Sequence, residues 1–258
     1  MGTQLKAALS ILPLLIGISF GQIAAQSAVP VIGSHTGLSG EEVVNNMVRR
    51  NLERAAALEA FQATRVYRLE YRGFPGSRNA EMIIDVKYQS PATKEFTVRS
   101  VTGSKVIIER VFNKLLQSEK EALTQENQNR VALNNDNYSF ALTGQECTPA
   151  GLYYILSVEP RTKNKLLYRG RIWVDATDFA VARIEAAPAK NPSFWTKETN
   201  IEQIYIKVGE FWLPTSNRST SNTRLGGHAL LTIDYTDYKV TAAVPARADS
   251  KETIAGRR

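Results

Sequence analysis

The side chains best suited to catalysis or metal binding are few and isolated in this sequence. His35 lies near the N-terminus and His228 follows two glycines, and neither has a histidine or cysteine nearby at metal-ligand spacing. The only cysteine, Cys147, has no positioned partner, so we interpret it as a buried or half-buried bystander, with an oxidation-sensitive thiol as the alternative. The sequence therefore predicts no metal site and no cofactor.

Two pairs of carboxylates could in principle support acid–base chemistry. Asp175 and Asp178 bracket a predicted hairpin turn, where aspartate caps backbone amides. Asp234 and Asp237 are three positions apart in a predicted strand and should point to opposite faces. The chain also lacks a Gly-x-Ser-x-Gly elbow, a Walker loop and a His-Glu-x-x-His motif. We therefore expect no enzymatic activity, and a hydrolase without a recognisable motif is the weakest alternative.

Two aromatic pairs are candidates for ligand contact instead. Phe194 and Trp195 fall in a predicted loop, where large apolar side chains either tuck against the protein or line the mouth of a binding site. Phe211 and Trp212 open a predicted strand and are more typical of a core. We take Phe194 and Trp195 as the mouth candidates.

The first 25 residues have the features of an export signal. Lys6 precedes an apolar run from Ala7 to Phe20, and small residues follow up to Ala25, after which we expect cleavage. An uncleaved membrane anchor is the alternative, but the run is short for a spanning helix and contains Pro13. No cysteine follows the cleavage site, so we expect no lipid anchor and a soluble protein. The sequence predicts a periplasmic protein, with secretion as the alternative.

Charge and cysteine content limit the function classes further. The net charge of the 258-residue chain is +7, and its basic residues are scattered, which favours a mildly basic surface over a site for anionic lipid. An export signal argues against a nucleic-acid partner. One cysteine excludes an internal disulfide, so a core must stabilise the fold. We expect a monomer.

The predicted organisation has four parts. Residues 1–25 form the signal, 26–38 a flexible leader, 39–243 a single domain and 244–258 a mobile basic tail. Ser39 and Glu42 form a capping box that should start an amphipathic helix running to about Ala60. A second helical stretch is predicted over 104–123, and the Asn-rich residues 124–137 suggest a loop.

The rest of the domain alternates between apolar and polar residues at the period of a strand. In the predicted strands 65–71, 81–88 and 95–101, one face is apolar and the other charged, which is typical of antiparallel sheets. Further strands are expected at 138–142, 152–158, 166–174, 179–184, 201–208, 211–219 and 229–240. No crossover helix separates these later strands. We therefore predict a mostly antiparallel α+β fold: a curved, incomplete β-barrel of about ten strands, with amphipathic helices inside it or over its opening.

The hairpin formed by Arg171–Asp175 and Asp178–Glu185, followed by Lys207–Pro214 and Leu231–Val240, resembles the outer-membrane lipoprotein-sorting family. The resemblance covers roughly residues 40–240. The chain is similar to LolA-like proteins and more loosely to LolB and RseB. This resemblance implies an incomplete barrel closed by helices around an apolar cavity for acyl chains. The shared motifs are more specific for the fold than for the function.

From these observations we expect a non-catalytic envelope protein that holds an acyl chain of a lipid or lipoprotein. The alternative is a protein-interaction or stress-sensing module of the same fold with a filled core, whose partners are envelope proteins. The predicted apolar lining consists of Tyr67, Leu69, Tyr71, Met82, Ile84, Val86, Phe96 and Val98, with Ile172 and Val174 opposite.

Overall fold

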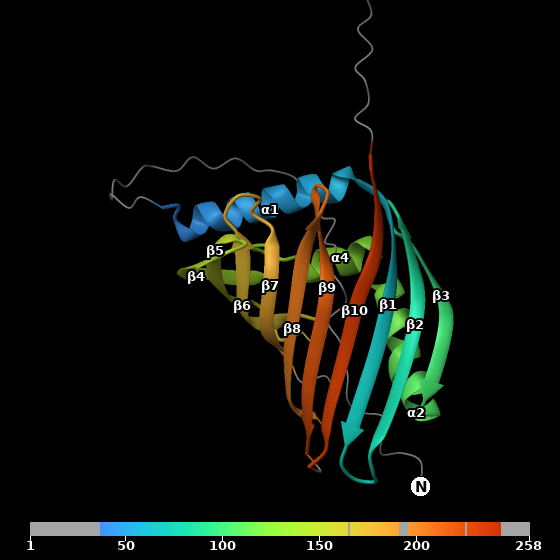
Figure 1. Ribbon diagram of the computed structural model, residues 1–258. Coiled ribbons are helices and arrows are strands. Elements are labelled where there is room, and N and C mark those ends of the chain that lie inside the picture. Colours follow the sequence, from blue (N-terminus) through green and yellow to red (C-terminus); the bar gives the residue numbers. More distant parts are fainter. Residues whose placement is uncertain (1–36, 165, 191–195, 225, 244–258) are drawn as a thin grey trace, which may run out of the picture.

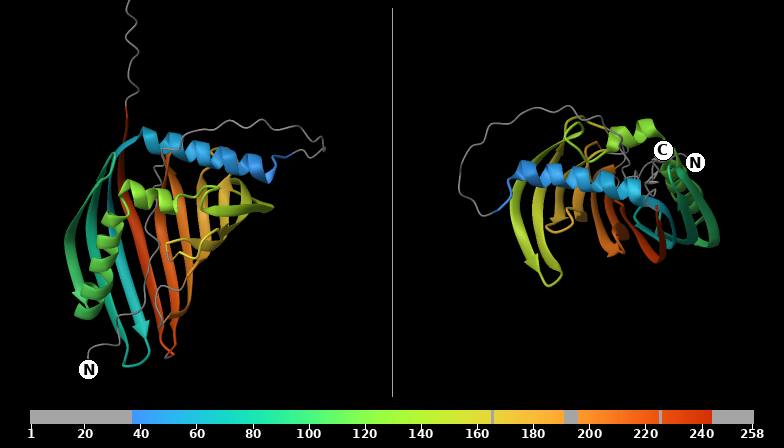
Figure 2. Two further views of the ribbon diagram at one scale, coloured as in Figure 1. Left: turned by 180° about the vertical axis from the view of Figure 1, so that it is seen from behind. Right: turned by 90° about the horizontal axis from the view of Figure 1, so that it is seen from above.

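A single curved antiparallel sheet dominates the computed structural model, which describes residues 37–243 except 165, 191–195 and 225. Its ten strands follow the order β3-β2-β1-β10-β9-β8-β7-β6-β5-β4, so β3 and β4 form the two edges (Figure 1). Seen from above, the sheet is an open arc with the helices on its inner side (Figure 2). The predicted fold class, a mostly antiparallel incomplete barrel with helices at its opening, is confirmed.

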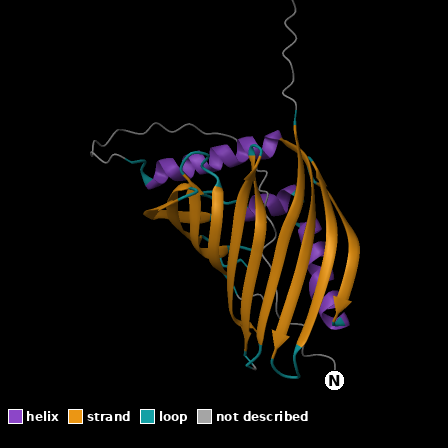
Figure 3. Cartoon of the chain, viewed as in Figure 1, coloured by secondary structure: helices purple, strands orange, loops and turns teal. Residues whose placement is uncertain are grey.

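Long strands, most of them joined by short turns, make up more than half of the described residues (Figure 3). Their bounds are β1 (Leu58–Arg72), β2 (Arg78–Gln89), β3 (Thr93–Gly103), β4 (Tyr138–Thr148), β5 (Gly151–Pro160), β6 (Tyr168–Asp175), β7 (Val181–Pro188), β8 (Thr196–Val208), β9 (Phe211–Thr223) and β10 (His228–Ala242). All ten predicted strands are present, and most are longer than predicted. The pattern of apolar residues detects only the part of a strand that a core covers, whereas backbone pairing continues beyond it.

Helix α1 (Gly40–Ala57) begins as the sequence predicts. The side chain of Ser39 accepts a hydrogen bond from the backbone of Glu42, and the Glu42 carboxylate accepts one from the backbone of Ser39. The helix ends three residues earlier than predicted. Leu58 adopts an extended backbone and starts β1, where its side chain joins the core of the sheet.

The second predicted helical stretch is present, but it is not α-helical throughout. It consists of α2 (Lys105–Ile107), a π-helical segment η1 (Ile108–Phe112) and α3 (Asn113–Glu121). A π turn contains more residues than an α turn, so it rotates the apolar stripe around the axis. Phe112 is therefore fully buried, whereas the neighbouring Val111 is only partly buried.

The prediction of a loop over 124–137 is also wrong in part, because α4 (Gln125–Val131) lies within it. Propensity disfavours a helix in this Asn-rich stretch, but tertiary burial of Gln128 and Val131 stabilises it. Asn137 donates to the backbone oxygens of Asn129 and Ala132 and so fixes the chain after the helix.

The proposed signal, leader and tail lie largely outside the described residues, and the division of the chain into domains stays a prediction. Among the described residues, no helix is both long and apolar enough to span a bilayer.

Candidate functional site

The inner face of the arc is the candidate site, because the register places the predicted lining residues on it. Opposed residues of antiparallel strands share a face, so the pairing can be followed strand by strand. One continuous row crosses the sheet on the inner face: Leu142, Leu156, Ile172, Ile184, Gln203, Asn217, Ile233, Tyr67, Met82 and Val101. We call this the central row.

Two apolar clusters cover the two ends of this face. At the end formed by β1, β2, β9 and β10, Ile107 and Phe112 pack against sheet residues. At the other end, Val43, Val44 and Met47 of α1 pack against β4–β8. The helices therefore contribute their apolar side chains to two separate parts of the inner face.

The predicted lining residues divide between these clusters. Those of β1 and β2 lie in the first cluster, buried except for the partly buried Tyr71, whereas Ile172 and Val174 are fully buried in the second. Phe96 is partly buried on β3. Val98 pairs with the buried Ile84 yet is 51% exposed, because β3 is an edge strand. The mouth candidates Phe194 and Trp195 lie outside the described residues.

A buried group of charges joins α3 to the sheet beneath it. Arg65 of β1, 1% exposed, donates from Nη1 to both carboxylate oxygens of Glu119, at 3.0 and 2.8 Å. Lys94 of β3 donates to the same carboxylate. The Arg65 guanidinium also lies over the ring of Tyr235, 5.0 Å from its centroid. We call Arg65, Lys94 and Glu119 the charge cluster.

The charge cluster shifts the pKa of each of its members. Burial acts to raise the pKa of Glu119, but the two cations and their hydrogen bonds hold it at about 2. Burial lowers the pKa of Lys94 more than the attraction of Glu119 raises it. For Arg65 the same attraction outweighs burial, and its pKa lies well above the usual value. Glu119 is therefore ionised throughout the physiological range.

The charge cluster was not predicted from the sequence, although the sequence contains a signal for it. Arg65 has the same parity along β1 as Tyr67 and Leu69, and Lys94 the same parity along β3 as Phe96. A charge at an apolar position of an alternating strand indicates a buried partner. Glu119 follows Leu115 by four residues, which places it on the apolar side of its helix.

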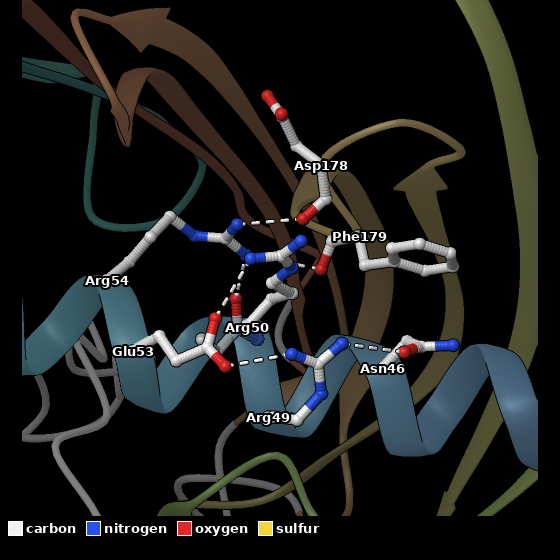
Figure 4. Close-up of polar contacts among 8 residues, drawn as sticks. Asn46, Arg49, Arg50, Glu53, Arg54, Asp178 and Phe179 are labelled. Carbon is white, nitrogen blue, oxygen red and sulfur yellow. Dashed lines mark hydrogen bonds and ion pairs between the residues drawn. The ribbon is translucent and has the colours of Figure 1, made fainter.

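A second polar link holds α1 to the hairpin between β6 and β7 (Figure 4). Arg54 donates to the backbone oxygens of Asp178 and Phe179, at 2.8 and 3.2 Å, and to the side chain of Asn51 at 2.7 Å. Burial lowers the pKa of Arg54. Arg49 and Arg50 pair with Glu53 on the exposed side of the same helix.

The aspartates of this hairpin have structural roles. Asp175 accepts from the backbone amides of Thr177 and Asp178, as the turn prediction requires. Asp178 accepts from Lys207 and from the Trp212 indole at 2.7 and 2.8 Å, and the bond with Lys207 lowers its pKa. One turn thus connects α1 with the hairpin between β8 and β9.

The middle of the inner face is polar, unlike its two ends. Gln203 of β8 and Asn217 of β9 oppose each other in the central row, and Ser219 opposes Ile201 in the next. Gln203, Asn217 and Ser219 are each 2% exposed. We call these three residues the polar strip. It was not predicted from the sequence, because polar residues occupy both faces of β9 and leave no alternation of apolar and polar positions.

The other residues named from the sequence either lie away from this face or have structural roles. The prediction of a buried or half-buried Cys147 is wrong, because this residue lies near the end of the edge strand β4 and is exposed. His228 opens β10, as predicted, and contacts Asn222. Phe211 is buried in the first cluster, as expected for a core residue. Asp234 pairs with Arg68. Within the described part of the chain, no three His, Cys, Asp or Glu residues are grouped to hold a metal ion.

Comparison with known proteins gives structural neighbours only. No protein-family model and no curated protein matches this sequence. Similar solved structures include a putative outer membrane lipoprotein-sorting protein domain from Vibrio parahaemolyticus, with 11% identity over 81% of this chain and 96% of that one and a TM-score of 0.40. A LolA superfamily protein from Nitrosomonas europaea has 11% identity, the same coverage of both chains and a TM-score of 0.32.

The Pseudomonas aeruginosa MucA/MucB complex structure contains a third neighbour. It has 10% identity over 79% of this chain and 99% of that one, with a TM-score of 0.26. The first two are named for the family that the strand-and-turn pattern resembles. At these identities and TM-scores they carry no argument about the function of this chain.

Proposed function

We propose that this protein is an exported, non-catalytic binding protein of the cell envelope that holds an acyl chain of a lipid or lipoprotein against the inner face of its sheet. The observation that carries the proposal is the covering of that apolar face by separate helices. The helices reach it through a few large side chains, Val43, Val44 and Met47 at one end and Ile107 and Phe112 at the other. An acyl chain can replace such contacts without loss of the sheet's own hydrogen bonds.

The hydrophobic effect makes this exchange favourable. Each buried CH₂ contributes about 0.8 kcal/mol, so a chain of about 14 carbons gains roughly 10 kcal/mol before the costs of ordering and helix displacement. Loss of helix contacts offsets part of this gain. The balance suits a carrier, which must bind reversibly.

The polar contacts that attach α1 and α3 to the sheet determine which of these two helices moves more easily. Glu119 of α3 accepts from two buried cations, whereas Arg54 of α1 donates to two backbone oxygens in a half-buried site. Charges paired in a buried site resist separation more than a partly solvated link does. We therefore propose that α1 is the mobile cover and that α3 remains attached.

A second candidate function is a protein-interaction module with a filled inner face. The exposed edge strand β3 favours it, since Val98 and Val101 are 51% and 40% exposed there. An unpaired edge with apolar side chains can accept a strand from a partner protein. In this case the helices would stay in place.

Native mass spectrometry with lipid extraction distinguishes the two. The protein is purified gently after expression of the full 258-residue chain in a Gram-negative host, and its mass also reports whether residues 1–25 are removed. A co-purifying acylated species, or uptake of a fluorescent fatty acid by the apo protein, is the expected result. An apo mass together with no uptake would refute acyl binding and favour the interaction module.

A Thr97→Lys/Ser100→Lys variant serves as the matched control. Both residues are exposed on β3 and oppose Asp85 and Ile83, so they belong neither to the predicted lining nor to the central row. The fold and acyl uptake should therefore be unchanged, while strand addition to β3 should be weakened.

A further inference from the structure

The polar strip contains buried hydrogen-bonding atoms with no partner among the described residues. Asn217 donates from Nδ2 to the Gln203 side-chain oxygen at 3.3 Å, but Gln203 Nε2, Asn217 Oδ1 and Ser219 Oγ have none. Buried polar groups nearly always find a partner, and leaving one unpaired costs free energy. Three such atoms on adjacent strands, on a face that we propose to bind a ligand, indicate where that ligand is polar.

The unpaired atoms specify the chemistry of the missing partner. The Gln203 amide offers a donor, Asn217 an acceptor, and Ser219 can act as either. Exchanging oxygen and nitrogen in both amides reverses their bond but still leaves one donor and one acceptor free. A secondary amide supplies both complements, through its carbonyl and its N–H. An ester supplies only an acceptor.

The surroundings favour a neutral group over an anion. The neighbours of Gln203 and Asn217 along the central row are Ile184 and Ile233, and the neighbours of Ser219 in its own row are Ile201 and Leu231. No charged side chain belongs to either pair of neighbours. Burying a phosphate or carboxylate beside neutral amides would leave its charge uncompensated.

A nearby pair of buried polar residues has its hydrogen bonds satisfied within the protein. Thr199 and Ser221 oppose each other in the row after Ile201 and Ser219, and their hydroxyls hydrogen-bond to each other at 2.9 Å. They are as buried as the polar strip, at 4% and 2% exposure. Burial of polar residues alone therefore does not create unpaired atoms in this region.

We infer that the polar strip is a subsite that recognises the neutral amide linkage of an N-acylated ligand, while the apolar ends of the inner face take its hydrocarbon. The inference rests on the proposed acyl binding and adds the linkage that is recognised. All the side chains that would recognise the linkage belong to β8 and β9.

The test compares two probes with the same chain and different linkages, N-methylhexadecanamide and methyl hexadecanoate. Each displaces a fluorescent fatty acid from the purified full-chain product, and the ratio of their dissociation constants is measured. We expect the amide to bind about tenfold more tightly than the ester. A ratio near one in the wild-type protein would overturn the inference and leave acyl binding intact. Failure of both probes to bind would refute acyl binding and the inference with it.

Variants locate the discrimination. In Gln203→Leu/Asn217→Leu both partners become apolar, which tends to preserve folding, and the ratio should fall to about one with little change for the ester. Ser219→Ala should lower it by a smaller factor. The matched control Thr199→Val/Ser221→Ala, which removes the self-paired hydroxyls, should keep the wild-type ratio. A ratio that persists in the double leucine variant would also overturn the inference, and the wild-type ratio decides it even if that variant does not fold.

Discussion

Replacing Glu119 by glutamine should strongly destabilise the protein, because it removes the anion of the charge cluster. Arg65 and Lys94 would remain buried, and no other carboxylate of the described residues pairs with either. Removing one partner of a buried ion pair costs about 3–5 kcal/mol. The pKa of Glu119 gives a similar value: the change from 4.5 to about 2 corresponds to roughly 3 kcal/mol at 1.36 kcal/mol per unit.

The pH dependence of this contribution has a definite sign. The pKa of Glu119 is lower in the folded protein than in the unfolded chain, so its contribution is complete above about pH 5 and is lost as the pH falls toward 2. The difference in stability between wild type and Glu119→Gln should therefore be largest at neutral pH. At pH 3 it should be about half as large.

Urea denaturation followed by tryptophan fluorescence measures both effects. With an m-value of roughly 3 kcal/mol/M, a loss of about 3 kcal/mol lowers the midpoint by about 1 M at pH 7. The control is Glu121→Gln, the same change on an exposed carboxylate of the same helix, which should leave the midpoint nearly unchanged. A midpoint for Glu119→Gln equal to that of the control, or a difference that stays constant down to pH 3, would refute the reasoning.

Three further predictions concern the elements that frame the inner face. Arg54→Ala should lower the free energy of unfolding by about 1–3 kcal/mol and speed amide hydrogen exchange in α1, because two hydrogen bonds to backbone oxygens are lost. Arg49→Ala, on the exposed side of the same helix, is the control, and equal exchange rates in the two variants would contradict this prediction. Gly170→Ala should lower the thermal midpoint by many degrees, because the φ of Gly170 is +153° and an added Cβ would lie 2.2 Å from the backbone oxygen of Glu185. In the control Gly144→Ala the added Cβ meets nothing within 4 Å, so similar midpoints for the two variants would disprove the clash. Ser39→Ala should cost about 1 kcal/mol by removing the cap of α1, and an unchanged urea midpoint would count against that role.

The sequence predicts the sheet well because its signal repeats ten times. Most strands have one apolar face, and a short turn such as Asp175–Asp178 specifies that the next strand is antiparallel. Bounds are less well predicted, as at Leu58, where one apolar residue suits both the stripe of α1 and the first position of β1. The π segment before Asn113 is also beyond a pattern of fixed α-helical period.

The candidate site is harder to predict because its decisive residues break the pattern that identifies the fold. Arg65 and Lys94 are charges at apolar positions, and their meaning depends on Glu119, which lies more than 20 residues away on a helix. Asn217 and Ser219 belong to a strand whose two faces are equally polar in sequence, so periodicity assigns them to neither. Pairing resolves this, because Ile233 and Leu231, which oppose them on β10, identify the inner face.

The position of the polar strip suits a role in binding better than a role in folding. A core selected only for stability would place apolar residues at Gln203 and Asn217, since apolar side chains of similar size avoid the cost of unpaired amides. The charge cluster carries a similar cost, but it attaches a helix to the sheet. The polar strip joins only the neighbouring strands β8 and β9, which twelve residue pairs already hold in register. Its cost is therefore not offset by any structural link among the described residues. A ligand that pairs with these atoms would offset it, and the amide–ester ratio measures that pairing directly.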